Sequence, residues 1–70
     1  MIKLNELLMF TEAKELRVDV PVSRRLTARI TVHGNQPAEL EDLVELYGDY
    51  DVFSLEPFGT DGVLKIELKR

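Results

Sequence analysis

The first leucines of the chain recur at helical spacing. Leu4, Leu7 and Leu8 fall at i, i+3 and i+4, and Thr11 follows at i+7. Residues with this spacing share one face of a helix. The sequence therefore predicts a short helix of about three turns that ends near Ala13.

Two runs of strict alternation come next. Apolar residues occupy every second position over residues 16–22 and again over residues 26–32, with mostly polar residues between them. This pattern is typical of strands with one buried face. Residues 23–25 are short enough to join the two strands as a hairpin. Pro21 has no N–H to donate to a ladder, so the first strand is expected to lie at an edge of the sheet near this residue.

A second helical pattern follows a break at residues 34–37. Asn35 is a good N-cap, and Pro37 suits the first turn of a helix. Gly48 is expected to end the helix in a left-handed conformation. The apolar stripe between these signals repeats at helical spacing: Leu40, Leu43, Val44 and Tyr47.

The last third of the chain predicts a second hairpin, with strands over residues 50–57 and 63–69 and a turn that contains Gly59 and Gly62. The order is then α-β-β-α-β-β. We expect a single α+β domain over residues 1–70, in which two hairpins form one four-stranded antiparallel sheet and two helices cover one face of it. The expected core consists of Leu4, Leu7, Leu8, Val18, Val20, Ile30, Val32, Leu40, Leu43, Val44, Phe53, Leu64, Ile66 and Leu68.

Length and composition narrow the functional classes. Seventy residues form one small domain with a marginal core. Without cysteine, neither a disulfide framework nor a cysteine zinc site can form. No apolar run approaches the roughly 18 residues of a membrane span, and no signal-like stretch follows the start. The sequence is that expected of a cytoplasmic protein.

The chain offers little that could carry catalysis. His33 is the only histidine, and it falls on the polar side of the second predicted strand, where an exposed strand-end histidine is the expected role. The four glycines are isolated and form no phosphate-binding loop. Asp49-Tyr50-Asp51 lacks the further oxygen ligands of a calcium loop. We therefore expect no enzymatic activity, and no catalytic, cofactor-binding or metal-binding residues.

Charge is distributed unevenly along the chain. The net charge is −4, and residues 39–51 contain six carboxylates and no base. Helical spacing crowds Glu41, Asp42 and Glu45, and like charges one turn apart are slightly destabilising. This arrangement indicates a face that meets a basic partner, such as a nucleic-acid-processing enzyme. The alternative is a solvated face that promotes solubility.

Basic residues gather at the tip of the first hairpin. Arg24 and Arg25 lie in the predicted turn, and Arg29 follows in the next strand. Guanidinium groups bind phosphate well, so a nucleic-acid-binding regulator is an alternative function. Equally, Arg29 or Arg17 could pair with Asp19 across the strands. A basic tip and an acidic helix together would also allow head-to-tail self-association, for instance as a homodimer. A structural subunit that self-associates through an exposed strand edge is a third alternative.

Two aromatic residues at the ends of predicted elements are candidate anchors for a partner. Tyr50 follows the second helix, and Phe58 lies in the last turn, where packing at the edge of the core is the alternative role for each. The complete expected partner-binding set is Glu41, Asp42, Glu45, Asp49, Tyr50, Asp51 and Phe58.

Parts of the chain resemble a known family. A hairpin precedes an acidic helix that closes with Leu46-Tyr47-Gly48, and residues 63–68 read Val-Leu-Lys-Ile-Glu-Leu. Over roughly residues 16–68 this order is similar to that of the small uracil-DNA glycosylase inhibitors of Bacillus phages. Both ends of the chain are also similar to short phage and prophage proteins of Gram-positive bacteria. The resemblance implies a small non-catalytic protein that binds and blocks a host nucleic-acid enzyme or defence complex.

Overall fold

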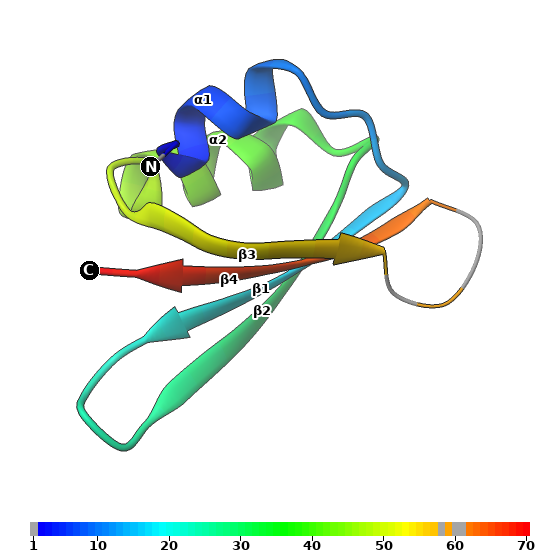
Figure 1. Cartoon of the computed structure of the whole chain (residues 1–70). Coiled ribbons are helices and arrows are strands. Elements are labelled where there is room, and N and C mark those ends of the chain that lie inside the picture. Colours follow the sequence, from blue (N-terminus) through cyan, green and yellow to red (C-terminus); the bar gives the residue numbers. More distant parts are fainter. Residues whose placement is uncertain (1, 58, 60–61) are drawn as a thin grey trace.

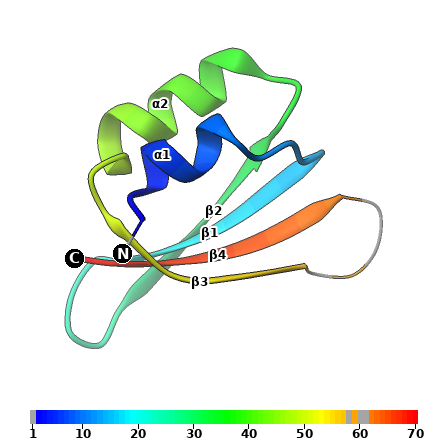
Figure 2. The same ribbon diagram turned by 45° about the horizontal axis from the view of Figure 1, so that its top comes forward.

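The chain forms one four-stranded sheet with both helices on the same face (Figures 1 and 2). The structure is a computed structural model that describes residues 2–57, 59 and 62–70. A four-stranded sheet with two helices is the α+β architecture expected from the sequence. Its elements are α1 (Leu4–Met9), β1 (Glu15–Pro21), β2 (Thr27–His33), α2 (Pro37–Tyr47), β3 (Asp51–Pro57) and β4 (Val63–Lys69).

The sheet is mixed, so the prediction of a purely antiparallel sheet was wrong. Its strand order is β2-β1-β4-β3, with antiparallel pairs β1–β2 and β3–β4 and a parallel pair β1–β4. The central strands each contribute a strictly alternating apolar face, residues 16, 18 and 20 in β1 and residues 64, 66 and 68 in β4. Placing these two strands side by side puts the most apolar surface beneath the helices.

β1 is a central strand of the sheet, but its side that faces β4 is open at Pro21, so the edge expected near this residue is present. The strand lies between β2 and β4, but its pairing with β4 covers only Glu15 to Asp19. Pro21 is opposite Thr27 of β2 and lies beyond the last residue paired with β4. The missing N–H therefore costs no ladder hydrogen bond on that side.

The core forms between the helices and the sheet, mostly as predicted. Val44, on the edge of the α2 stripe, is 38% exposed, and Phe53 is the larger exception, because it is 63% exposed. It lies where the register of β3 shifts, between Val52 opposite Leu68 and Ser54 opposite Glu67, so a β-bulge interrupts the alternation there. Leu16 is buried although it was not among the expected core residues. The buried side chains are Leu4, Leu16, Val18, Val20, Val32, Leu43, Ile66 and Leu68.

The helix ends differ from the predicted ones. Helix α1 ends at Met9, and Met9 and Phe10 are largely exposed. The N-cap of α2 is Gln36 and makes no side-chain capping bond. Gly48 is right-handed, with φ −58°. A glycine is still required at this position, because a Cβ atom would overlap the carbonyl oxygen of Val44.

Neither helix has the length and apolar character needed to cross a membrane, as far as the described part of the chain shows.

Candidate functional site

The exposed side of α2 brings three of the predicted partner-binding residues together. Glu41, Asp42 and Glu45 are exposed on this helix, and we call them the acidic α2 face. Leu43, on the other side, is only 3% exposed and holds α2 against the core. Since α2 contains no lysine or arginine, its own sequence supplies no neutralising charge. Asp49 is also exposed, two residues after the helix.

Glu39, in the first turn of α2, binds the end of β2. Its Oε2 atom accepts a hydrogen bond of 2.8 Å from the backbone N–H of His33 and lies 3.1 Å from Nδ1 of the His33 ring. The backbone hydrogen bond is the main reason why the pKa of Glu39 lies below its ordinary value of 4.5. His33 is an exposed residue at the end of a strand, as its sequence position predicts.

Asp51 and Tyr50 contact the N-terminal segment. The Lys3 ammonium lies 2.8 Å from Oδ1 of Asp51. The backbone N–H of Leu4 donates to the carbonyl of Tyr50 at 3.0 Å, and Val52 N–H donates to Ile2 at 2.9 Å. These contacts give both residues a structural role at the start of β3.

The other aromatic contacts place Tyr50 partly in the core. Its ring meets that of Tyr47 edge to face, with centroids 5.4 Å apart, and Nε–H of Arg70 donates to its hydroxyl at 3.4 Å. Tyr50 is half-buried as a result. The second aromatic candidate, Phe58, lies outside the described residues.

The Lys3–Asp51 pair predicts acid-sensitive stability. The hydrogen bond from Lys3 holds the pKa of Asp51 below its ordinary value of 3.8. A carboxyl whose pKa is lower in the folded state stabilises the fold above the pKa of the unfolded chain, and that stability is lost as the pH falls. We expect the melting temperature to drop as the pH falls below about 4.

Thermal melts across this pH range test the assignment. Lys3→Met should flatten the decline, whereas Lys14→Met, at another exposed lysine, should leave it unchanged. Equal pH profiles for the parent and both variants would contradict the role given to Lys3.

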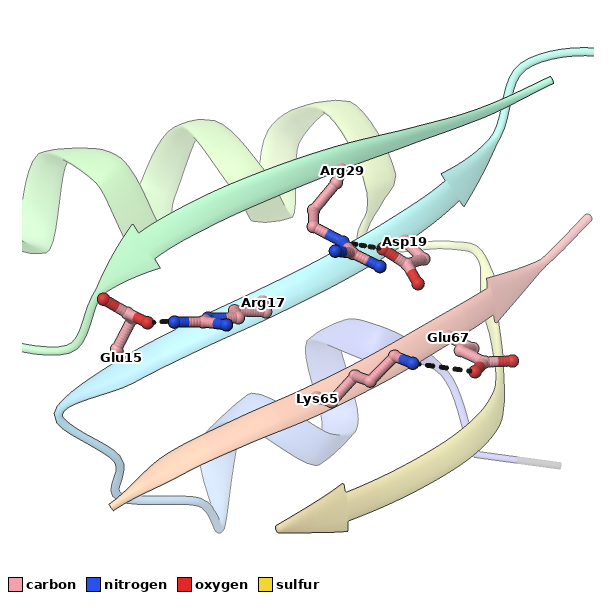
Figure 3. A network of polar contacts seen from close by, with 6 residues as sticks. All are labelled: Glu15, Arg17, Asp19, Arg29, Lys65 and Glu67. Carbon is pink, nitrogen blue, oxygen red and sulfur yellow. Dashed lines mark hydrogen bonds and ion pairs between the residues drawn. The ribbon is translucent and has the colours of Figure 1, made fainter. Parts of the chain in front are cut away.

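The sheet face opposite the helices is covered by ion pairs (Figure 3). Nε of Arg29 lies 3.0 Å from Oδ1 of Asp19, so Arg29 pairs across the strands, as the alternative interpretation proposed. Arg17 instead lies 2.9 Å from Glu15 of its own strand. Hydrogen bonding to Asp19 also raises the pKa of the Arg29 guanidinium.

The three arginines of the basic tip lie in two different environments. Arg24 and Arg25 are exposed in the turn, where Ser23 Oγ accepts a hydrogen bond from Leu26 N–H at 3.2 Å. Arg29 is held by a carboxylate on the open sheet face. A phosphate at the tip would therefore meet Arg24 and Arg25 first, while Arg29 would have to leave Asp19.

Two apolar hollows flank α2. The larger, of about 910 Å³, lies between the helices and is lined by Leu8, Leu40, Val44, the chain that leads into β1 and the chain that follows β2. The smaller, of about 220 Å³, lies between α2 and β2. It is lined by Ile30, Thr31, Val32, Glu39, Asp42, Leu43, Leu46 and Tyr47. We call it the β2–α2 groove.

The sequence interpretation missed this groove. Leu46 is 66% exposed in it. The available signal was that Leu46 lies off the apolar stripe of its helix, three residues after Leu43 and beside Tyr47.

Within residues 2–57, 59 and 62–70, no group of three or more histidine, aspartate or glutamate side chains is arranged to hold a metal ion.

Comparisons with protein-family models, with curated proteins and with solved structures gave no match.

Proposed function

We propose that this chain is a non-enzymatic protein-binding module whose acidic α2 face docks on a basic surface of its partner. The observation that carries the proposal is the separation of charge on the molecule. Glu41, Asp42 and Glu45 are exposed on a helix without bases. On the open sheet face, in contrast, Asp19 and Glu67 each lie beside a cation.

Electrostatics explain why such a face suits recognition. A cluster of one sign accelerates the encounter with an oppositely charged surface and disfavours partners of like charge. Basic surfaces of this kind occur on enzymes that handle nucleic acids, because those enzymes neutralise phosphates with lysine and arginine. We propose such an enzyme as the partner, and inhibition through occupation of its basic surface as the effect.

The test is a triple charge reversal of the acidic α2 face. Glu41→Lys, Asp42→Lys and Glu45→Lys together should lower recovery of the partner from host lysate by about tenfold or more, because like charges across an interface cost several kcal/mol. The fold should survive, since exposed substitutions usually change stability by no more than about 0.5 kcal/mol each. Recovery by the parent protein should also fall as salt rises.

A matched control separates the position of the charge from the total charge. Glu6, Glu12 and Glu56 are exposed outside α2, and reversing all three to lysine gives the same net charge as the first variant. This control should retain the partner. If the α2 variant recovers as much partner as the control variant does, the three carboxylates of the acidic α2 face are only solvated.

A further inference from the structure

The free edge of β2 has backbone groups that no strand of the described chain pairs. β2 is the outermost strand of the sheet beside β1. Gly34 N–H donates to the carbonyl of Lys14 at 2.9 Å, which fixes the even-numbered residues of β2 as those that bond β1. The N–H and C=O groups of Thr27, Arg29 and Thr31 therefore point away from the sheet. We call them the β2 edge.

The β2 edge ends before His33, because the outward backbone groups of His33 already have partners. The carboxylate of Glu39 takes the next outward N–H, that of His33, and the carbonyl of His33 accepts from Gln36 at 3.1 Å. An added strand would thus find its partners only as far as Thr31. The Glu39 cap sets one limit of the open segment.

The opposite edge of the sheet is protected. The N-terminal segment covers the start of β3. Val52 N–H donates to the carbonyl of Ile2, and Lys3 forms an isolated antiparallel β-bridge with Asp51. A β-bulge follows at Val52–Ser54, and β3 ends at Pro57. Covering segments, bulges and prolines are the usual means by which proteins block strand addition at an edge. The described part of β2 has neither a proline nor a bulge.

The β2–α2 groove runs beside this open edge. Ile30 on the helix side of β2 is only half-buried, and Leu46 of α2 is 66% exposed. The carboxylate-bearing residue Asp42 lies one helical turn before Leu46, and both line the groove. An extended segment laid on the edge would therefore place every second side chain against an apolar wall that has an acidic end.

The spacing of the groove matches that of a strand. Four helical residues, from Asp42 to Leu46, rise about 6 Å along the axis. Two residues of an extended strand span about 6.6 Å. Side chains at positions i and i+2 of an added strand can therefore meet Asp42 and Leu46 in turn.

We propose that the β2 edge binds an extended segment of the partner protein as a fifth, antiparallel strand. On the helix side, this segment has a lysine or arginine facing Asp42 and an apolar residue over Leu46 two positions later. Backbone hydrogen bonds to Thr27, Arg29 and Thr31 hold the segment, and the groove selects the side chains. This inference rests on the proposed function, because Asp42 belongs to the acidic α2 face.

Charge favours a basic segment over a second copy of this chain. Pairing β2 with β2 of another copy would bring two α2 helices together, and each is acidic without a base. Like charges across an interface are repulsive. A lysine-bearing strand meets the same carboxylates with attraction.

The probe is the blocked peptide Thr-Thr-Lys-Thr-Leu-Thr-Val-Thr, added to isotopically labelled protein at concentrations up to the millimolar range. We expect NMR shifts and slower hydrogen exchange at the amides of Thr27, Arg29 and Thr31. Two N-methylated peptides, one for each set of alternate residues, provide a backbone control. Only one of them should lose binding, because alternate N–H groups of a strand face the same neighbour.

Variants of the protein divide the backbone contribution from the side-chain contribution. Thr31→Pro removes an outward N–H without breaking the ladder to β1 and should abolish binding, whereas Thr31→Val should retain it. Asp42→Lys should weaken binding about tenfold or more. Glu41→Lys makes the same charge change on α2 but outside the groove lining, so it should have a much smaller effect.

Four results of the peptide experiments would overturn strand addition: shifts confined to other parts of the molecule, equal loss of binding with both N-methylated peptides, unchanged binding by Thr31→Pro, or equal losses with Glu41→Lys and Asp42→Lys. A dimer formed through β2 in sedimentation experiments would also overturn it. If strand addition fails while the triple reversal still abolishes capture, the proposed function stands and only this docking mode is wrong. If the peptide binds as described but the triple reversal leaves capture intact, the proposed function fails instead.

Discussion

Leu43→Ala is expected to unfold a large part of the protein at room temperature. Leu43 is 3% exposed and is the one fully enclosed side chain that α2 contributes among the described residues. Truncating a buried leucine costs about 2–5 kcal/mol, because the transfer energy is lost and a cavity remains. A domain of this size rarely has more than about 3–5 kcal/mol of stability. The substitution should therefore remove most of the protein's free energy of unfolding.

Leu46→Ala is the matched control for this prediction. It makes the same chemical change three residues later on the same helix, but at a side chain that is 66% exposed. Its effect on the free energy of unfolding should stay within about 0.5 kcal/mol. Urea unfolding followed by circular dichroism compares the two variants. Equal midpoints would mean that α2 does not pack on the sheet through Leu43.

The faces of the strands could be predicted from alternation, but their neighbours could not. Val18 and Ile66 are completely buried, as their parity indicates. The parallel pairing that places Val18 opposite Ile66 joins segments 48 residues apart in the chain. Alternation is the same in parallel and antiparallel strands, so nothing local distinguishes the two arrangements.

Departures from regular geometry account for the remaining errors. Phe53 has the position and character of a core residue, yet the bulge at Val52–Ser54 changes the register and leaves it exposed. Gly48 has the position of a left-handed cap, but it is a glycine because its backbone passes close to Val44. The bulge belongs to the pairing of β3 with β4, whereas the obstacle at Gly48 lies one helical turn back in α2. Their positions could be found in the sequence, whereas their causes could not.

The candidate site shows the same division. The exposure of Glu41, Asp42 and Glu45 follows from helical periodicity, because these residues lie off the Leu40–Leu43 stripe. Asp51 is equally acidic in the sequence, but the structure pairs it with Lys3. Which strand offers an exposed edge could not be predicted, for another reason. An edge is defined by strand order, which alternation does not determine.

Gly34→Ala is expected to have the second large effect on stability. Gly34 follows β2, and its N–H donates to the carbonyl of Lys14 at 2.9 Å. A Cβ atom on Gly34 would overlap the backbone carbonyl of Ala13. Since the obstacle is backbone, no side-chain rotation can relieve it, and the α1–β1 connection must separate from the end of β2. Overpacking of this kind costs about 1–3 kcal/mol.

The same displacement should reach α2. Gly34 begins the turn that leads into this helix, directly after the His33 N–H that Glu39 binds. We therefore expect Gly34→Ala to lower the melting temperature by roughly 4–8 °C for each kcal/mol lost, and to speed hydrogen exchange at the His33 amide. Asn35→Ala, at the exposed neighbouring residue, should change neither quantity. An unaltered melt for Gly34→Ala would show that β2 and the α1–β1 connection do not approach each other so closely. Lost stability with an unaltered His33 amide would instead confine the strain to the β1 side and leave the Glu39 cap in place.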